Sequence, residues 1–437
     1  MAQSDQVAPV FGQARFEPLL PRRYWVLIVM TMVYAVNIAD RFALSSLIEP
    51  IKAEFRLSDS GVGLVTGTAF ALCHALASLP AGRLADRTHR RNLIAVALAV
   101  WSIFTGLCGV AQNFVQLLFA RFGVGLGEAG ATPAAHSILA DYFPPAERVI
   151  AMSVFAIGIT IGSGFGGMAG GIFADHFGWR FGLILVASIN LAILALLFTV
   201  HEPERGGNDA PARKAHQHPT LGETLRFVRG SRALMHLLIA GTIADFAGGG
   251  LVWWTPAFLL RSHGFTVGEA GLQVGLMGGV GGTCALLLTA LATIRLARFA
   301  ARWQCWFLVA LTGLLTIPGV AAYAVGSTGL ALALLWLFVP FINAHVGPTL
   351  GLLQNLAPRN MRGQTVAILL FAANLANLAV APQLIGGLSD LLAPHLADPS
   401  QSLRITLALC GLSGIWAAWH FWAAMRTLPQ DLIRAAK

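Results

Sequence analysis

Long apolar segments alternate with short polar segments along almost the whole chain. An α-helix needs about 20 predominantly apolar residues to cross the ~30 Å hydrocarbon layer of a bilayer. Twelve segments are roughly this long or longer, which predicts twelve membrane-spanning helices. They cover residues 24–47, 61–82, 92–112, 114–140, 149–174, 179–200, 233–260, 268–294, 303–325, 329–357, 363–392 and 404–426.

The fold class that these segments predict is an all-α integral membrane protein. Strands of a membrane barrel are ~10 residues long and alternate in polarity, whereas these segments are continuous apolar runs. The composition agrees, because 56% of the residues are hydrophobic and only 11% are charged, against about 25% charged in soluble domains. Residues 1–23 are polar and contain three prolines, so we expect no cleavable signal peptide before the first span.

The longest polar interruption separates the sixth apolar segment from the seventh. Its first part, HEPERGGNDAPARKAHQHP (201–219), is rich in Pro, Gly and charge, which is typical of a flexible linker. Leu221, Leu225 and Val228 then share one helical face, which predicts a short helix on the membrane surface. We therefore expect two six-helix bundles with a linker between them. The predicted boundaries are 1–23 for the cytoplasmic N-terminal segment, 24–200 and 233–426 for the bundles, 201–232 for the linker and 427–437 for the cytoplasmic tail.

A short internal repeat supports this division. The segment RLADRTHR (83–90) follows the second span, and RLARFAAR (295–302) follows the eighth. Duplicated bundles are the organisation in which transporters place a substrate site between the halves, near the middle of the membrane.

The positive charge of the chain is distributed unevenly between the two sides of the membrane. The net charge is +9, and if both termini are cytoplasmic, 22 of the 29 Lys and Arg residues lie on the inner side and five on the outer side. This is the positive-inside pattern, so the basic residues orient the protein and meet anionic lipid headgroups. We expect a multi-pass protein of the plasma (inner) membrane, monomeric, with no nucleic-acid partner.

Cofactor and metal chemistry find no support in the sequence. The five cysteines fall inside predicted spans without a CxxC pair, and the twelve histidines are scattered without HExxH, so we propose no metal site. GLGEAG (125–130) matches a dinucleotide fingerprint formally, but no strand precedes it. No nucleotide-binding GxxxxGK[ST] motif occurs either, so we expect an ion gradient, a proton gradient, in place of a cofactor.

Ionisable residues inside the first span are the clearest functional signal. Tyr34, Asn37 and Arg41 are spaced to form one polar stripe, and Asp40 flanks it by about 100°. Ionised side chains in hydrocarbon cost about 2.5 to 3.5 kcal/mol each on insertion scales, and they usually mark ion or substrate pathways. We assign Arg41, Asn37 and Tyr34 to substrate binding.

The fourth and seventh spans add further ionisable groups. Arg121 and Glu128 lie on one face two turns apart, and Asp245 lies near the middle of the seventh span. We assign Asp40 and Glu128 to proton binding, because burial and a nearby arginine act in opposite directions on a carboxylate, so small movements can release or bind its proton. Arg121 is assigned to substrate binding. A structural ion-pair network that joins the helices is the alternative reading.

Two further groups of residues fall inside spans. Asp245, Asn343, His345, Asn374 and Asn377 are cavity candidates, with interhelical hydrogen bonding as the alternative role. Glycines at four-residue spacing in the fifth span are assigned to helix packing, because they remove side chains along one face. They are Gly158, Gly162, Gly166 and Gly170.

The loop after the second span is a candidate cytoplasmic gate. An acid among arginines could close the cytoplasmic side by an ion pair and open it when that pair breaks, although the same arginines could serve only to orient the chain. The gate residues are Gly82, Arg83, Asp86, Arg87 and Arg90.

Several motifs resemble a known family. GRLADRTHRR (82–91) resembles the loop signature between the second and third helices of the major facilitator superfamily, and RFGVGLGEA (121–129) is similar to its fourth-helix motif. GITIGSGFGG (158–167) resembles the fifth-helix glycine motif, with Ser163 where the family has proline. NIADRF, GLGEAGATPA and WTPAFLLRSHGF look most like the spinster branch. The resemblance implies proton-linked transport of lysophospholipid or sphingoid-type amphiphiles.

We therefore expect a secondary transporter that works by alternating access, exporting an amphipathic small molecule in exchange for protons. A transporter of small organic anions or drugs is the alternative within the same family. An intramembrane lipid enzyme and a lipid receptor that moves nothing are the alternatives of another class. No nucleophile with an adjacent base is evident in the spans, which disfavours an enzyme.

Overall fold

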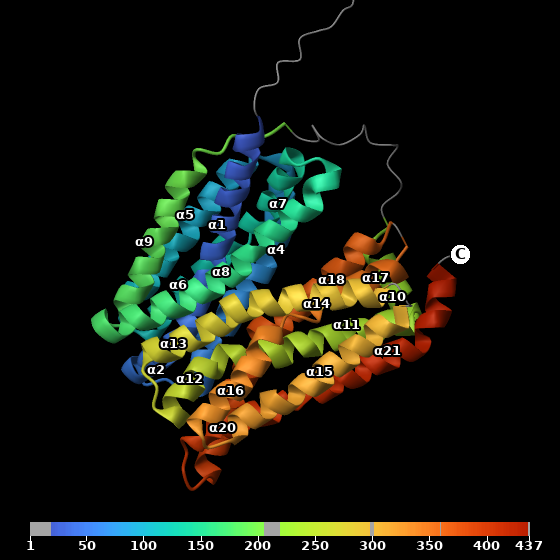
Figure 1. The fold of residues 1–437 in the computed structure, drawn as a ribbon. Coiled ribbons are helices and arrows are strands. Elements are labelled where there is room, and N and C mark those ends of the chain that lie inside the picture. The colour runs from blue at the N-terminus through green and yellow to red at the C-terminus, as the bar shows by residue number, and fades with distance from the viewer. Residues whose placement is uncertain (1–18, 205–218, 298–300, 359, 436–437) are drawn as a thin grey trace, which may run out of the picture.

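Figure 1 shows a computed structural model of the chain that describes residues 19–204, 219–297, 301–358 and 360–435. Within these ranges every regular element is a helix. The N-terminal half consists of α1 (Leu19–Ser46), α2 (Ile48–Phe55), α3 (Asp59–Gly63), η1 (Leu64–Thr68), α4 (Ala69–Arg87), α5 (Arg90–Val110), α6 (Phe114–Glu128), α7 (Ala131–Tyr142), α8 (Pro145–Phe177) and α9 (Trp179–Leu197).

The C-terminal half begins with a short amphipathic helix, α10, whose Thr220 and Glu223 form a capping box. This helix packs against α11 and α18. The elements of this half are α10 (Leu221–Gly230), α11 (Arg232–Asp245), η2 (Phe246–Gly250), α12 (Leu251–His263), α13 (Val267–Leu276), η3 (Met277–Gly281), α14 (Gly282–Ala297), α15 (Ala301–Ala324), α16 (Thr328–Phe338), η4 (Val339–Phe341), α17 (Val346–Leu356), α18 (Arg362–Asn374), η5 (Leu375–Val380), α19 (Ala381–Leu392), η6 (Ala393–His395), α20 (Gln401–Gly411) and α21 (Ser413–Ala435).

Eleven helical stretches of the described chain are long and apolar enough to cross a membrane, and they match every predicted span except the fourth. The fourth is divided at Ala129 and Gly130 into α6 and α7, of 15 and 12 residues. Each piece alone is too short to span the bilayer. The all-α, two-bundle architecture expected from the sequence is confirmed.

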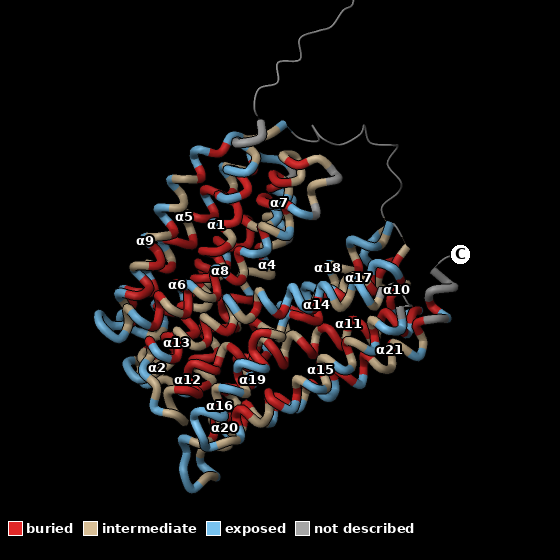
Figure 2. The backbone as a smooth tube through the Cα atoms, in the orientation of Figure 1, coloured by how far each residue is buried: buried red, intermediate tan, exposed pale blue. Residues whose placement is uncertain are grey.

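Buried residues line the contacts between helices, and exposed residues form the outer surface. Figure 2 shows buried residues where helices of a half face each other and exposed residues on the outside. Many exposed residues are large and apolar, for example Leu76, Ile150, Ile317 and Leu391, each more than 60% exposed. A surface of this kind is expected where lipid, rather than water, surrounds the protein.

Glycine allows α8 to lie directly on α1. Gly158, Gly162, Gly166 and Gly170 all face α1, and a Cβ atom on Gly166 would lie 2.2 Å from the backbone oxygen of Ala39. Real Cβ atoms do not approach so closely, so any side chain there would push the two helices apart.

The two halves meet at one end of the molecule and diverge at the other (Figure 1). We call the end at which α1 and α11 begin the linker side, and the opposite end, where α2 and α3 lie, the closed side. On the closed side α8 packs along α13, and α3 packs along α19. A Cβ on Gly271 would lie 2.3 Å from the oxygen of Gly167, and one on Gly386 would lie 2.3 Å from the oxygen of Asp59.

Four of the spans contain a π-helical turn near their middle, namely η1, η2, η3 and η5. Such turns widen the helix and alter its carbonyl pairing, and they are frequent at functional sites. Here η5 contacts both η1 and η2. The hydroxyl of Thr68 in the N-terminal half donates to the backbone oxygen of Ala379 in η5 at 2.9 Å, so a π-helical turn takes part in the contact between the halves.

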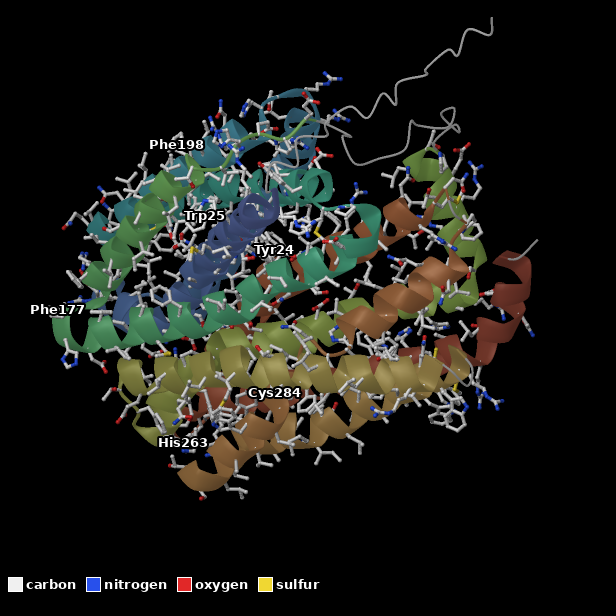
Figure 3. The ribbon with its side chains drawn as sticks, turned by 45° about the horizontal axis from the view of Figure 1, so that its top comes forward. Tyr24, Trp25, Phe177, Phe198, His263 and Cys284 are labelled. Carbon is white, nitrogen blue, oxygen red and sulfur yellow. The ribbon has the colours of Figure 1, made fainter. Side chains whose placement is uncertain are left out.

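Aromatic residues mark both ends of the N-terminal half (Figure 3). On the linker side, the indole nitrogen of Trp25 donates to the hydroxyl of Thr199 at 2.8 Å, which ties α1 to the end of α9. Phe177, at the closed-side end of α8, is 64% exposed. Aromatic residues at both ends of spans are typical of the membrane–water interfaces.

Candidate functional site

A buried ion pair lies in the centre of the N-terminal half. The Nε atom of Arg41 donates to Oε2 of Glu128 at 2.8 Å, and an Nη atom of Arg41 lies 2.7 Å from the same oxygen. Arg41 also donates to the side-chain oxygen of Asn37 at 3.3 Å. The Glu128 side chain is fully buried and that of Arg41 is 13% exposed, so the pair is shielded from bulk water.

Glycines of α6 bring Glu128 to this position. Gly125 faces α4, where a Cβ would lie 2.4 Å from the backbone oxygen of Phe70, and Gly127 faces α5, where a Cβ would lie 2.7 Å from the nitrogen of Trp101. Because α6 lacks side chains at these contacts, it fits closely between α4 and α5 and turns Glu128 toward α1.

Arg121 lies close to this pair but forms no ion pair of its own among the described residues. It is 2% exposed, and its Nε donates to the backbone oxygen of Val65 at 3.4 Å, a long hydrogen bond. Its guanidinium carbon lies 5.1 Å from the centre of the Phe70 ring, and that of Arg41 lies 4.8 Å from the same ring. A ring face attracts cations, so Phe70 lies close to two guanidinium groups, and among the described residues only that of Arg41 has a carboxylate within ion-pair distance.

Asp40 forms its described hydrogen bonds with α5 and α9 and not with the Arg41–Glu128 pair. Its Oδ2 accepts a hydrogen bond from the hydroxyl of Thr105 on α5 at 2.6 Å and lies 3.3 Å from one end of the Asn190 amide on α9. The other oxygen, Oδ1, is buried without a hydrogen-bond partner. Consecutive helix positions differ by about 100°, so the two neighbouring ionisable residues of α1 face different parts of the bundle.

Tyr34 continues the polar stripe of α1 toward the linker side. Its ring stacks on Phe155 of α8 with centroids 4.6 Å apart and planes within 4°. Tyr34 and Asn37 share a small hollow with Thr132 and Ala135 of α7. The predicted substrate residues Tyr34, Asn37 and Arg41 therefore lie together on one face of α1.

In the C-terminal half the structure brings together two of the five cavity candidates. Nε2 of His345 lies 3.8 Å from Oδ2 of Asp245. Asn343 and Asn374 are exposed, and Asn374 donates to the backbone oxygen of Leu370 at 2.8 Å. The side-chain oxygen of Asn377 is buried without a partner.

A cavity of about 460 Å³, a volume that includes open solvent, lies beside the Asp245–His345 pair. Its walls are almost entirely apolar, and His345, Thr312 and Thr316 supply the only side-chain nitrogen and hydroxyl groups. Among the described residues, no group of three or more His, Cys, Asp or Glu side chains is placed to hold a metal ion.

The closed side is fastened by a cluster of charges that the sequence reasoning missed. Arg261 of α12 donates to Oε1 of Glu49 at 2.8 and 2.6 Å, and to the two carboxylate oxygens of Asp59 at 2.8 and 2.7 Å. Lys52 bonds to Asp59 as well. We call Glu49, Lys52, Asp59 and Arg261 the closed-side cluster, because it joins the two halves there.

A second carboxylate strengthens the same side from α19. Asp390 accepts hydrogen bonds from the backbone nitrogens of Asp59 and Ser60 at 2.9 and 2.8 Å, and from the Ser60 hydroxyl at 2.6 Å. The sequence analysis placed Glu49, Lys52, Asp59 and Arg261 between predicted spans, and Asp390 near the end of the eleventh predicted span, 363–392. One signal in the sequence could have indicated the ion pairs: the acids Glu49 and Asp59 follow the first span, and the base Arg261 lies at the end of the seventh, on the same side of the membrane.

On the linker side, the predicted gate residue Arg90 bonds within its own half. It pairs with Asp141 and Glu202, and its Nε lies 2.7 Å from Glu202. Arg83 and Arg87 are exposed, and a Cβ on Gly82 would meet nothing within 4 Å. The side chain of Asp86 lies outside those that the structure describes. In this conformation Arg90 thus anchors the start of the linker and does not join the two halves.

Comparison with known proteins agrees with this geometry. A sequence profile of the Major Facilitator Superfamily matches residues 30–381. The chain is 32% identical over 420 residues to an MFS-type efflux pump of Mycolicibacterium smegmatis, covering 95% of this chain and 96% of that protein. It is 28% identical over 456 residues to protein spinster homolog 1 of Homo sapiens (97% and 85%), and 26% identical over 377 residues to a hexuronate transporter of Bacillus subtilis (84% and 87%).

A solved structure shares the fold along nearly the whole chain. It is a bacterial homolog to the human lysosomal transporter spinster, in an inward-facing and unoccupied conformation. The TM-score is 0.84 at 25% identity, with 94% of this chain and 98% of that chain covered. An inward-facing and occupied structure of such a homolog gives a TM-score of 0.80.

Proposed function

The chain belongs to the Major Facilitator Superfamily as a spinster-like transporter, and from this premise we propose that it exports an amphipathic, lipid-like substrate in exchange for protons. It is a secondary transporter and not an enzyme. The substrate class we propose is a zwitterionic amphiphile of the lysophospholipid or sphingoid type.

The observation that carries the proposal is the arrangement of charge around Phe70. Arg121 is buried and has no carboxylate of the described residues within ion-pair distance, while Arg41 is paired with Glu128. An unpaired buried guanidinium is costly unless an anion joins it, and a phosphate suits the fork of an arginine. The ammonium group of the same substrate would form an ion pair with Glu128, and the acyl chain would lie along apolar helix faces.

Asp40 and Glu128 are the proposed proton sites. A proton on Glu128 removes the charge that holds Arg41. At Asp40, hydrogen-bond geometry supports a bound proton: with its amide reversed, Asn190 accepts from the indole nitrogen of Trp101 at 3.2 Å and donates to the Val186 oxygen at 3.2 Å. The amide oxygen then faces Asp40, which must carry a proton to bond with it.

The charge of the substrate determines the sign of the coupling. An arginine released by protonation of its carboxylate would bind an anion together with the proton, which favours symport. An ammonium group that needs the ionised carboxylate competes with the proton, which favours exchange. A zwitterion offers both groups, and we propose antiport because the carboxylates are the groups shared by proton and substrate.

The contacts between the halves support the proposed alternating-access cycle. In this conformation the closed-side cluster and the α8–α13 and α3–α19 contacts hold one side shut. We propose that the linker side is cytoplasmic, as the positive-inside pattern implies, and that the cargo enters from there. Export driven by an inward proton gradient then needs the closed side to open while the linker side closes.

Transport of a small organic anion is the second candidate. The unpaired Arg121 would suit a carboxylate as well as a phosphate, and the similarity to a hexuronate transporter is consistent with such a cargo. The two candidates differ in the acyl chain, because only an amphiphile gains affinity from apolar surface.

The test uses the purified chain in sealed vesicles with an imposed pH gradient. A lysophospholipid, a sphingoid base, a hexuronate and a cationic drug are offered separately, and both movement and substrate mass are measured. We expect gradient-driven movement of an amphiphile with unchanged mass, lost pH dependence in Asp40→Asn and Glu128→Gln, and parent behaviour in Arg404→Gln. Arg404 is a matched control because its described bonds stay within the C-terminal half.

Each contrary result identifies another function. Movement of the hexuronate alone would support the second candidate, and tighter lipid binding at low pH would reject antiport. A change in mass would indicate an enzyme, and binding without movement would indicate a receptor. Parent-like pH dependence in both acid variants would assign coupling to other residues.

Location and orientation complete the proposal. We propose a monomer in the plasma (inner) membrane with both termini in the cytoplasm, in contact with membrane lipids. In a background that carries Cys284→Ser, because Cys284 is exposed, the variant Glu204→Cys should react with an impermeant thiol reagent only from the inside. Reaction only from the outside would reverse the orientation.

A further inference from the structure

We infer that Asp245 and His345 form a second proton-binding site, in the C-terminal half, where the two side chains share one proton. The inference deepens the proposed proton-coupled function and rests on it for its role in transport. Proton binding at the pair can be measured without transport.

The ring hydrogen bond of His345 fixes which nitrogen carries the hydrogen when the imidazole is neutral. Its Nδ1 lies 3.0 Å from the backbone oxygen of Ile342, and because a carbonyl oxygen only accepts, Nδ1 carries the hydrogen. A neutral imidazole then has a lone pair on Nε2. Nε2 is buried and has no hydrogen-bond partner among the residues that the structure describes, so the acceptor of this ring remains unused there.

The Asp245 carboxylate faces this lone pair. The distance of 3.8 Å between Nε2 and Oδ2 is too long for a hydrogen bond, as expected for two acceptors that face each other. One added proton would turn this contact into an N–H···O or O–H···N bond. The His345 side chain is 4% exposed and that of Asp245 is 18% exposed, so the bond would form largely out of water, where it is strongest.

Both residues lie where the regular α-helix of their span is interrupted by another helical form or a turn. Asp245 is the last residue of α11, directly before the π-helical turn η2, and His345 lies in the turn between η4 and α17. Neighbours of both, Ala244 and Gly248 on one side and Ile342 on the other, line the 460 Å³ cavity. Drawing the pair together would therefore change the shape of that cavity.

The position of the pair matches that of the ion pair in the other half. Arg41 and Glu128 join the first span to the fourth, and Asp245 and His345 join the seventh to the tenth. In a duplicated bundle these are corresponding helices. Each half thus places two ionisable groups between the first and the fourth of its six spans. Arg41 and Glu128 form a direct ion pair, whereas Asp245 and His345 lie too far apart for a hydrogen bond.

Other ionisable groups on the elements packed around the pair do not bond to it. Those at the linker-side ends of their helices are Arg232 on α11, Arg295 on α14, Arg302 on α15, Arg362 on α18, and Arg426 and Asp431 on α21. His236 of α11 and His420 of α21 bond to each other through their Nδ1 atoms at 2.8 Å. Tyr323 of α15 bonds to Thr255, and α14 and α15 also carry Cys284 and Cys305. Elements η2, η4, η5 and α17 carry none.

The test counts the protons that the purified full-length chain takes up between pH 8 and pH 5.5. We expect Asp245→Asn and His345→Gln each to lose about one proton per molecule, and the double variant to lose the same one. Asp245→Glu, whose longer side chain reaches toward Nε2, should restore the uptake. His236→Gln, which alters the other histidine pair, controls for a general effect of removing a partly buried histidine.

Every outcome bears on the pair. Parent-like uptake in both single variants, or a double variant that loses two protons, would overturn the shared site. If a variant fails to fold, the nitrogen NMR spectrum of labelled parent protein decides, because one histidine that is protonated at Nδ1 must gain a hydrogen bond at Nε2 over this pH range. If the vesicles show no proton-linked transport while the uptake pattern holds, the proposed function fails and the site stands.

Discussion

Replacement of Arg261 by glutamine should release the closed side. Arg261 supplies four hydrogen bonds from the C-terminal half to Glu49 and Asp59 of the N-terminal half, all between 2.6 and 2.8 Å. Removing one partner of a buried ion pair costs about 3 to 5 kcal/mol. Lys52 still neutralises Asp59, and Glu49 is 22% exposed, so we expect a loss of about 2 to 3 kcal/mol. That free energy corresponds to a change of roughly 30- to 150-fold in the equilibrium between the closed and open states of this side.

The assay measures the distance across the closed side by spin labels at Ala53→Cys and Ala397→Cys, both exposed positions, in the Cys284→Ser background. With Arg261→Gln we expect a second, longer distance to become populated. The matched control is Arg404→Gln, which removes an arginine on the same side without removing a described bond between the halves. A single short distance in Arg261→Gln, equal to that of the control, would refute the assignment of this cluster as the bond that keeps the side shut.

Two further predictions concern stability. Burial alone would raise the pKa of Glu202, but hydrogen bonds from the Arg90 side chain and the Arg91 backbone, together with the Arg90 charge, hold that pKa below 4.5. The contribution of ionised Glu202 to the folding free energy is therefore complete above pH 4.5, and it is lost as the pH falls through the lower pKa of the folded state. Glu202→Gln should be about 1 to 3 kcal/mol less stable than the parent at neutral pH. The thermal denaturation curves of parent and variant should converge on acidification. Gly166→Ala, which forces α1 and α8 apart, should cost about 1 to 3 kcal/mol, whereas Gly82→Ala should leave the melting temperature unchanged; equal melting temperatures for the two alanine variants would contradict the packing argument.

The sequence was sufficient for the architecture because a bilayer imposes simple rules. Apolar length predicts the spans, and an ionisable group inside a span is costly enough to signal a function. Arg41, Glu128 and Arg121 were found in this way, and the structure brings them within one small region. The break in the fourth span at Gly130 escaped detection, because α6 and α7 read as one apolar run.

What the sequence could not predict depends on contacts between distant segments. The closed-side cluster joins residues more than 200 positions apart, and each of its members alone resembles an ordinary loop charge. Phe70 has no polar atom to mark it, although its ring lies beside two guanidinium groups. The angular position of Asp40 was predictable from helical geometry, but its partners Thr105 and Asn190 lie on spans whose rotation no sequence pattern indicated.

The number of coupled protons can be read from the slope of the conformational equilibrium against pH. Each proton bound in only one of two states changes their free-energy difference by about 1.36 kcal/mol per pH unit. One proton therefore needs about two pH units to offset the 2 to 3 kcal/mol assigned to Arg261, whereas two protons need about one unit. If Asp40, Glu128 and the pair Asp245–His345 each bind a proton in one conformation only, the ratio of long to short distances should change about 1,000-fold per pH unit in the parent and about 100-fold in Asp245→Asn. Equal slopes in parent and variant would show that the proton of the pair, even if it binds, does not drive the movement of the two halves.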